Sequence, residues 1–487
     1  MTGQATVKGG GCLRKKQLFV LLLVTAIFSS SGTYLAVKWL DGNKAVSSPV
    51  SGKGEDHGFS KVKKAYELIL DGYIEEVDGK DLIEGAIEGM LAALNDPYSV
   101  YLHGEKAARF NEALDSSFEG IGAEISESDG KIIIVTPFKN SPAEKAGLKP
   151  FDQILSVDGE DVTGMDLYDV TLKIRGEKGT TVTLEILREG SVQPVSVNVK
   201  RDRIPVETVF SEVIKHAGKQ IGYIEITSFS RKTGDDFTGH LRQLEKENID
   251  GLIIDVRGNP GGLLQSVQQI AGMLVPNEKP LFQVEKKDGH IEQFYSGQDK
   301  KKPYPIAVLT DKGSASASEI LAAALKEIGG YPVIGERTFG KGTVQQQIDL
   351  DNDSRMKLTM FKWLTPDGNR IHGKGIEPDL AVSQSGLYHL HPLQVDEPLS
   401  RDLNNEQVRH AQLVLKNLGY EPGRLDGYFN KTTEAAVRNF QEEHDLPVTG
   451  VIDQKTAVEM DRRVMKEREK KENDRQLQMA LKYFQYR

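Results

Sequence analysis

Short apolar runs typical of buried strands alternate with helical patterns across residues 205–385, and this alternation constrains the fold more than any other feature. Helical patterns over Asp235–Glu245 and Leu263–Leu274 separate the runs. Such alternation is typical of an α/β domain with helices covering a mixed sheet, and about 180 residues are ample for a core. The predicted strands are Ile221–Ile226, Gly251–Val256, Pro305–Thr310 and Tyr331–Ile334.

The N-terminus predicts a membrane-directed segment. Residues 1–16 carry four basic and no acidic residues, and residues 17–37 are uncharged. At about 1.5 Å per residue the uncharged stretch can just span a bilayer, with its basic flank in the cytoplasm and the rest of the chain outside. A cleaved signal peptide, ending near residue 31, is the rival interpretation because the strongest apolar run, Leu18–Phe28, is short; the lack of a clear Ala-x-Ala site favours an anchor. Residues 38–58 predict a linker.

Charge and cysteine content exclude some classes of protein. The net charge of −9 argues against a dedicated nucleic-acid binder, so no nucleic-acid partner is expected. Cys12 is the one cysteine, which rules out an intramolecular disulfide or a cysteine-rich metal site. It precedes the apolar run, so a lipoprotein cleavage site is not expected. The histidines of His389-Leu390-His391 are interpreted as incidental, and no metal site is predicted.

Within residues 59–200, the spacing of apolar residues changes near Phe118. Apolar residues in 59–114 have helical spacing, interrupted by Asn95-Asp96-Pro97, which predicts a helical region used for packing or for contacts in a homodimer. Strands are then predicted at Lys131–Thr136, Asp152–Asp158 and Thr181–Arg188, with a short capped helix from Ser141 and a second helix over Met165–Ile174. Residues 115–200 are therefore expected to form a compact β-rich module.

This module resembles a PDZ domain of the bacterial protease type, through FEGIGAEI, NSPAEKAGLKPFDQILSVDGEDV and IRGEKGTTVTLEILREG. The resemblance implies that an extended peptide is added as a strand and that backbone N–H groups bind its C-terminal carboxylate. The binding loop would contain Gly120, Ile121 and Gly122, although a plain turn also explains the glycines. Arg175 would pair with the peptide carboxylate or a neighbouring domain, or it is a solvated surface residue.

Ser316 stands where a predicted strand passes through a Gly/Ser-rich turn into a helix, in TDKGSASASEILAAALKEI. Backbone N–H groups at a helix start, Ala317 first, stabilise negative charge, as acyl transfer to a serine requires. The same segment has a simpler explanation, since Ser316 and Glu319 have the spacing of a capping box. Ser314 and Ser318 compete for the role of nucleophile.

A serine nucleophile needs a base, and none of the ten histidines lies in a motif beside this turn. A neutral lysine can serve if burial or positive potential lowers its pKa. Lys341 is the candidate, within a glycine-rich segment, and Gln345 has the strand parity to orient it without adding charge. Taken alone, Lys341 is equally explained as an exposed loop lysine.

Residues 59–385 resemble the carboxyl-terminal processing proteases, which are Ser–Lys endopeptidases carrying a PDZ domain. The resemblance rests on GSASASEI with a lysine 25 residues after the serine and a glutamine four later, and on NDPYSVYL, DVRGNPGGLL and WLTPDGNRIHGKGIEPD. It implies nucleophile Ser316, base Lys341 and orienting residue Gln345. The oxyanion hole would combine the N–H of Ala317 with that of Gly261 or Gly262. The implied substrates are proteins or peptides with free C-termini, and no cofactor is expected.

The C-terminal part predicts a second module. After a connector at 386–404, residues 405–463 have a small helical core and resemble the peptidoglycan-binding domain of cell-wall hydrolases. Peptidoglycan is the implied partner, and a docking module is the alternative. Residues 464–487 predict an apolar-striped helix that packs on the protease or on a second subunit.

The sequence therefore predicts a multidomain α+β protein: a membrane anchor, a helical segment, a β-rich PDZ domain over 115–200, an α/β protease core over 201–385 and an all-helical C-terminal domain. The predicted function is a serine endopeptidase that processes extracytoplasmic proteins at the bacterial cell envelope. A binding scaffold on an inactive core and a wall transpeptidase or amidase are the alternatives.

Overall fold

The computed structural model describes residues 57–104, 107, 117–128, 130–188, 193–351, 354–393, 395 and 397–486. The predicted anchor at 17–37 lies outside these residues, as does most of the predicted linker at 38–58. Within the described ranges, no helix combines the length and apolar character needed to cross a bilayer. Residues up to Ala86 and residues from Ile87 onward form two separate compact units.

The predicted helical region contains two helices and one strand. Helices α2 (His57–Gly72) and α3 (Gly79–Ala92) confirm the helical spacing, although α3 crosses the boundary between the two units. The prediction was wrong for β1 (Val100–His103), which pairs antiparallel with a strand more than 250 residues later. Pro97 ends the helical pattern, and the aromatic and β-branched residues after it favour an extended strand.

The β-rich module is built around a sheet whose core is made of alternating strand residues. The helices α5 (Pro142–Lys145) and α6 (Leu167–Ile174) belong to it, and Ser141 caps α5 as predicted, accepting the N–H of Glu144. Strand β2 (Ser117–Gly120) pairs instead with β9 (Asp202–Pro205). The sheet contains β3 (Ala123–Ser128), β4 (Lys131–Pro137), β5 (Gln153–Val157), β7 (Thr181–Leu187) and β8 (Val195–Lys200), with β6 (Glu160–Asp161) paired to β5.

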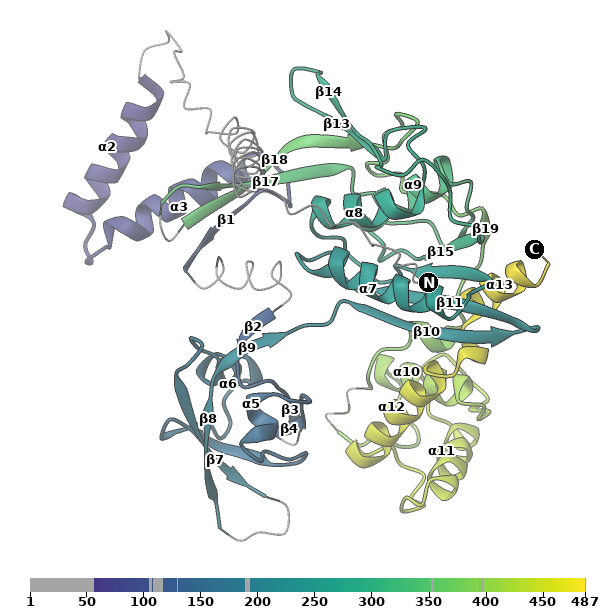
Figure 1. Cartoon of the computed structure of the whole chain (residues 1–487). Helices are drawn as coiled ribbons and strands as arrows, with labels where there is room; N and C mark the ends of the chain where they lie inside the picture. The colour runs from purple at the N-terminus through teal and green to yellow at the C-terminus, as the bar shows by residue number, and fades with distance from the viewer. Residues whose placement is uncertain are drawn as a thin grey trace, which may run out of the picture. The chain divides into compact units, whose positions relative to one another are not determined.

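The core domain is a six-stranded sheet in the order β10-β11-β12-β15-β16-β19 (Figure 1). The pair β10–β11 is antiparallel and every later pair is parallel, which confirms the predicted mixed sheet. The strands are β10 (Val209–His216), β11 (Lys219–Ile226), β12 (Gly251–Asp255), β15 (Ile306–Thr310), β16 (Val333–Gly335) and β19 (Leu380–Ala381).

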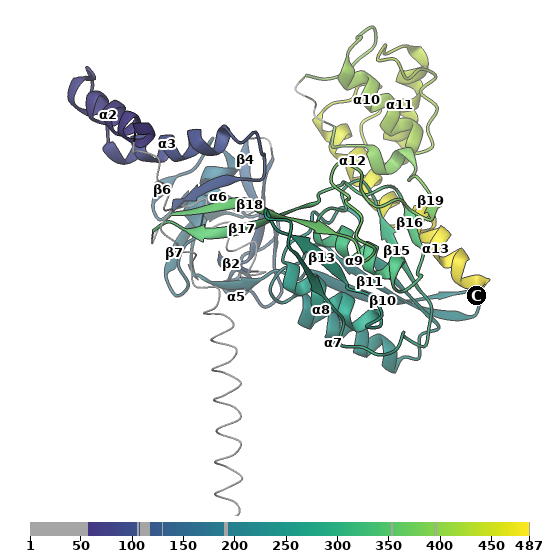
Figure 2. The same ribbon diagram turned by 90° about the horizontal axis from the view of Figure 1, so that it is seen from above.

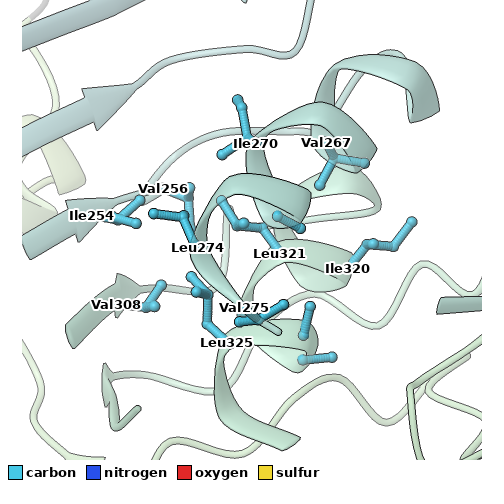
Figure 3. Close-up of a cluster of buried hydrophobic side chains, with 14 of the residues drawn as sticks. Ile254, Val256, Val267, Ile270, Leu274, Val275, Val308, Ile320, Leu321 and Leu325 are labelled. Atoms are coloured by element: carbon cyan, nitrogen blue, oxygen red, sulfur yellow. The ribbon is translucent and has the colours of Figure 1, made fainter. Parts of the chain in front are cut away.

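Helices cover both faces of this sheet. Figure 3 shows side chains of α8 (Leu264–Leu274) and α9 (Ala317–Glu327) packed against Ile254 and Val308 of the strands, and α7 (Thr233–Lys246) belongs to the same cluster. On the opposite face, Ile253, Leu309 and Ile334 contact helix α13 (Arg475–Gln485). The alternation of strand side chains between the two faces explains why both clusters are apolar. Packing on the protease core, one of the two alternatives predicted for the C-terminal helix, is confirmed for α13. The prediction of one helix over 464–487 was wrong, because residues 464–468 end the preceding helix and Asp474 caps a new one by accepting the N–H of Leu477.

A second sheet carries the segment around Lys341. Its strands are ordered β1-β18-β13-β14, and β17 (Thr343–Asp349) pairs with the long β18 (Ser354–Leu364), as Figure 2 shows. Strands β13 (Phe282–Glu285) and β14 (Ile291–Phe294) form a hairpin. The sequence analysis gave no strand for this sheet.

The C-terminal module has its own apolar core, in which η1 (Gly386–His389) packs with three helices. The helices are α10 (Glu406–Asn417), α11 (Lys431–Glu443) and α12 (Gln454–Arg468). Asn405, Asn430 and Asp453 cap them, each accepting the N–H of the residue three positions later. A short turn, η2 (Lys471–Asn473), leads from α12 to α13.

Candidate active site

Ser316 occupies the junction between β15 and α9 in a strained backbone conformation. Its φ is 55° and its ψ is −110°, a combination that non-glycine residues rarely adopt. Strained residues of this kind persist only where the surrounding structure fixes them, and they cluster at functional sites. Ser316 is partly buried, whereas the Ala317 that follows is buried.

The two competing serines of the turn have structural partners. The hydroxyl of Ser314 is fully buried and donates to the main-chain oxygen of Val256 at 2.7 Å. The hydroxyl of Ser318 is also fully buried and donates to the main-chain oxygen of Asn259 at 2.9 Å. Both therefore tie the turn to the segment after β12, which leaves Ser316 as the candidate nucleophile.

Glu319 connects the serine turn to the lysine segment. Its carboxylate is fully buried, and one oxygen accepts the N–H of Ser316 and the N–H of Lys341, each at 2.8 Å. The other oxygen accepts the Thr338 hydroxyl at 2.6 Å and the N–H of Gly340 at 2.7 Å. Ser316 and Glu319 form the predicted capping box, and the N–H of Glu319 also donates to the main-chain oxygen of Ser316 at 2.9 Å.

The glycine pair after Pro260 lies against the serine turn. A Cβ on Gly261, whose φ is 102°, would stand 2.8 Å from the Cβ of Ser316 and 3.0 Å from the nitrogen of Ala317. The N–H of Gly261 donates to the side-chain oxygen of Asn259 at 2.8 Å. This bond occupies the N–H of Gly261. It therefore favours the N–H of Gly262 as the oxyanion donor that would act together with that of Ala317. Asn259, which the sequence analysis did not single out, is fully buried and also donates to Ile226.

Lys341 extends from the segment before β17, and the indole N–H of Trp363 donates to its main-chain oxygen at 2.8 Å. Its Nζ lies 4.5 Å from the centroid of the Tyr98 ring. Burial lowers the pKa of Lys341 below its usual value, and the charge of Lys357 lowers it further, while Asp96 and Glu319 act in the opposite direction. The predicted depression of this pKa is thus present, with burial as the main cause rather than the end of α9.

Gln345 does not contact Lys341 directly. Gln345 and Thr343 share a strand face as the parity argument requires, but Lys341 lies before β17 begins, so parity does not fix the place of its side chain. The Gln345 amide instead donates to the hydroxyls of Thr343 and Thr359, each at 3.1 Å. In the described part of the chain, no hydrogen bond joins the Ser316 hydroxyl to Lys341 or Gln345 to Lys341.

Two of the four predicted peptide-binding residues of the β-rich module, Gly120 and Arg175, lie close to each other. A Cβ on Gly120 would lie 3.6 Å from the Phe118 ring and 3.7 Å from the Arg175 side chain, and the Arg175 guanidinium lies 4.9 Å from the centroid of that ring. Ile121 is buried, and its main-chain oxygen accepts the N–H of Ala143. Gly122 has a φ of 74° and faces Ser141 too closely for a side chain.

His391, one of the two histidines interpreted as incidental, packs against a histidine of α10. His391 stacks on His410 with ring centroids 3.7 Å apart, and a ring nitrogen of His410 contacts the main-chain oxygen of His391. Across the described ranges there is no group of three or more potential metal ligands. His391 therefore has a packing role in the structure.

Comparisons with known proteins decide the family. The model of peptidase family S41 matches residues 220–382. The carboxy-terminal processing protease CtpB of Bacillus subtilis is 50% identical over 475 residues, which cover 96% of this chain and 99% of the relative. The chain belongs to the carboxy-terminal processing proteases of peptidase family S41. CtpA of the same organism is 41% identical over 470 residues, covering 96% of this chain and 98% of CtpA.

Other family models match further parts of the chain. A PDZ domain model matches residues 120–199, a putative peptidoglycan-binding domain matches 404–460, and the N-terminal domain of the activating protease CtpB matches 26–106. The solved photosystem II D1 C-terminal processing protease is 31% identical, covering 67% of this chain and 86% of its own, with a TM-score of 0.42. The predicted carboxyl-terminal processing protease with PDZ and peptidoglycan-binding domains is confirmed.

Proposed function

We propose that this protease cleaves peptide bonds with Ser316 as nucleophile and Lys341 as general base. The supporting observation is that one oxygen of buried Glu319 binds the main-chain N–H groups of both residues, which are 25 positions apart in the chain. The lowered pKa of Lys341 increases the fraction of neutral amine that can accept a proton.

The reaction proceeds through an acyl-enzyme. The Ser316 hydroxyl attacks the peptide carbonyl as its proton passes to the Lys341 amine, and the carbonyl oxygen becomes an oxyanion. The N–H of Ala317, at the start of α9, and the N–H of Gly262 or Gly261 donate to this oxyanion. Lys341 then protonates the leaving amine, and water attacks the ester with Lys341 as base. Gln345 acts in this scheme through Thr343 and Thr359.

Two variants test the assignment. Cleavage of an unstructured protein such as casein by the purified full-length chain should be lost in Ser316→Ala and in Lys341→Ala. Lys312→Ala is the matched control, because Lys312 is an exposed lysine of the same turn and should leave cleavage unchanged. Circular dichroism of each variant checks the fold. Cleavage that survives Lys341→Ala would exclude Lys341 as the base.

The PDZ domain binds the C-termini of protein substrates in our proposal and delivers or gates them. Backbone groups at Gly120, Ile121 and Gly122 would bind the peptide carboxylate, with Arg175 beside them. The proximity of Gly120, Phe118 and Arg175 supports a common site. Deleting residues 115–200 separates the two roles, because basal cleavage rises if the domain is a gate and falls if it only delivers substrate.

We further propose that the enzyme works at the bacterial cell envelope, with residues 17–37 in the membrane and residues 405–463 on peptidoglycan. The domain match at 404–460 supports wall binding. Co-sedimentation with purified sacculi tests it, and deletion of 405–463 should abolish co-sedimentation while leaving casein cleavage intact. Membrane fractionation of full-length and N-terminally truncated chains tests the anchor.

A homodimer is the proposed assembly. Helix α2 exposes a row of large apolar side chains to solvent, as expected for a surface that packs on a second copy. These side chains are Phe59, Val62, Leu68, Ile69 and Leu70. Light scattering should give twice the chain mass of 53.9 kDa for the wild type and a lower mass for Leu68→Asp.

A further inference from the structure

The segment NDPYSVYL has no role in the reaction described above, yet it faces the predicted base. Residues Leu94–Ser99 line an open cleft of about 580 Å³ together with Thr343, Thr359 and His372. The Lys341 Nζ lies over the ring of Tyr98 at 4.5 Å, a distance at which an ammonium is attracted to an aromatic face. Tyr98, which lines the cleft, therefore contacts the amine proposed as the base.

Hydrogen bonds fix Asp96 in this cleft as a carboxylate. Its oxygens accept the Ser99 hydroxyl at 2.6 Å and the Tyr98 N–H at 3.1 Å. The Ser99 hydroxyl in turn accepts the Thr359 N–H, and the Gln345 amide donates to the hydroxyl of Thr359, which lines the same cleft. Burial raises the pKa of Asp96, but these hydrogen bonds outweigh it and leave the pKa below its usual value.

Lys357 carries a like charge on the face of β18 that it shares with Thr359, which lines the cleft. It lies on β18, opposite Gln347 of β17 and Val100 of β1. Burial lowers the pKa of Lys357, and Asp96 opposes this change. The charge of Lys357 lowers the pKa of Lys341, and the charges of Asp96 and of Glu319 on α9 raise it.

We propose that Asp96 and Lys357 are positioning residues of opposite sign for Lys341: Asp96, with the ring of Tyr98, stabilises the ammonium form of Lys341, and Lys357 destabilises that form and favours the neutral amine. The inference rests on the proposed function, since it takes Lys341 as the base. It also gives Gln345 a defined task, because the Gln345 amide holds Thr359, whose N–H donates to the Ser99 hydroxyl that donates to Asp96.

The sign of each effect follows from the charges. Removing the carboxylate of Asp96 destabilises the ammonium form, so the pKa of Lys341 falls and the neutral base persists at lower pH. Removing the ammonium of Lys357 has the opposite effect and raises the pKa of Lys341. A merely structural role for either residue would reduce the rate at every pH without moving the profile.

The test is the acidic limb of the pH profile of kcat/KM, which reports the base of the uncomplexed enzyme. The full-length chain is assayed on a fluorogenic peptide as wild type, Asp96→Asn, Lys357→Gln and the double variant. We expect the limb to move to lower pH in Asp96→Asn, to higher pH in Lys357→Gln, and to return close to the wild-type position in the double variant. Rates on the limb should change on the order of three- to tenfold.

Two controls keep the outcome decisive. Lys362→Gln removes an exposed lysine from the same strand and should leave the limb in place. If Asp96→Asn does not fold, Tyr98→Leu and Tyr98→Phe replace it: the leucine variant should move the limb to lower pH, and the phenylalanine variant, which keeps the ring, should not. Limbs that stay in place, or that move in the same direction for Asp96→Asn and Lys357→Gln, overturn the inference. Activity surviving in Lys341→Ala would overturn the proposed base itself.

Discussion

Replacing Glu319 with glutamine should uncouple the serine turn from the lysine segment while keeping the size of the side chain. The Glu319 carboxylate accepts four hydrogen bonds, two at each oxygen, and is fully buried. A glutamine offers one oxygen and one NH₂ group. The glutamine oxygen can accept two of the four hydrogen bonds. The NH₂ group then faces the other two donors and cannot accept from them.

The orientation of least cost places the NH₂ group beside Thr338 and Gly340. The Thr338 hydroxyl already accepts the N–H of Ile376 at 2.7 Å and can accept a second donor. The N–H of Gly340 then loses its acceptor, and an unsatisfied buried donor costs about 1–3 kcal/mol. The bonds to Ser316 and Lys341 lose their charge assistance, at roughly 1 kcal/mol each. The free energy of unfolding should fall by about 3–5 kcal/mol in total.

Urea unfolding and steady-state cleavage measure the two consequences. A displaced Ser316 or Lys341 main chain should lower kcat by on the order of 10²-fold, since small misplacements of reacting groups have effects of this size. Glu278→Gln, an exposed change of the same kind, is the matched control. A Glu319→Gln enzyme with wild-type kcat and a stability loss under about 1 kcal/mol would refute the role given to Glu319.

Three further predictions use the same assays. Asp474→Asn should cost about 1–3 kcal/mol at neutral pH, because Asp474 pairs with partly buried Arg257, which keeps its bonds to Asp255. Burial raises the pKa of Asp474, and the bonds from Arg257 lower it by a larger amount, so the charge stabilises the fold above the unfolded-state pKa of about 3.9. The difference from wild type should therefore shrink as unfolding is measured toward pH 3. Phe484→Ala should cost about 3–5 kcal/mol in urea unfolding, since the ring is fully buried against Gly251, whereas exposed Tyr486→Ala should cost little. Gly261→Ala should lower kcat by on the order of 10²-fold because its methyl group would meet Ser316, whereas Gly258→Ala, also at positive φ but with open space around it, should not.

The parallel sheet could be predicted from sequence because its strands are buried on both faces. β12 and β15 are continuous buried runs, and such runs are recognisable without knowing their partners. The second sheet lacks this signal. β18 alternates partly buried and exposed residues and pairs with β1, which lies more than 250 positions earlier, so neither its pattern nor its partner is local.

The candidate site was predictable in its residue types but only partly in its contacts. The capping interpretation of Ser316 and Glu319 and the catalytic one appeared to be alternatives, because a sequence pattern shows the Ser316 partner of Glu319 and not its Lys341 partner. Asn259 gave no signal, since a buried asparagine that holds a glycine N–H is indistinguishable from a turn residue until the fold is known.

Gln345 shows why a shared strand face does not by itself predict a contact. Gln345 and Thr343 do share a face, since the Gln345 amide donates to the Thr343 hydroxyl, and the amide also donates to Thr359, its direct partner on β18. Lys341 lies before β17 begins, so strand parity does not fix the place of its side chain. A neutral amide suits this position because it holds Thr359 without adding a charge near Lys341. A glutamate in its place would add negative charge, stabilise the ammonium form of Lys341 and reduce the neutral base on which the proposed mechanism depends.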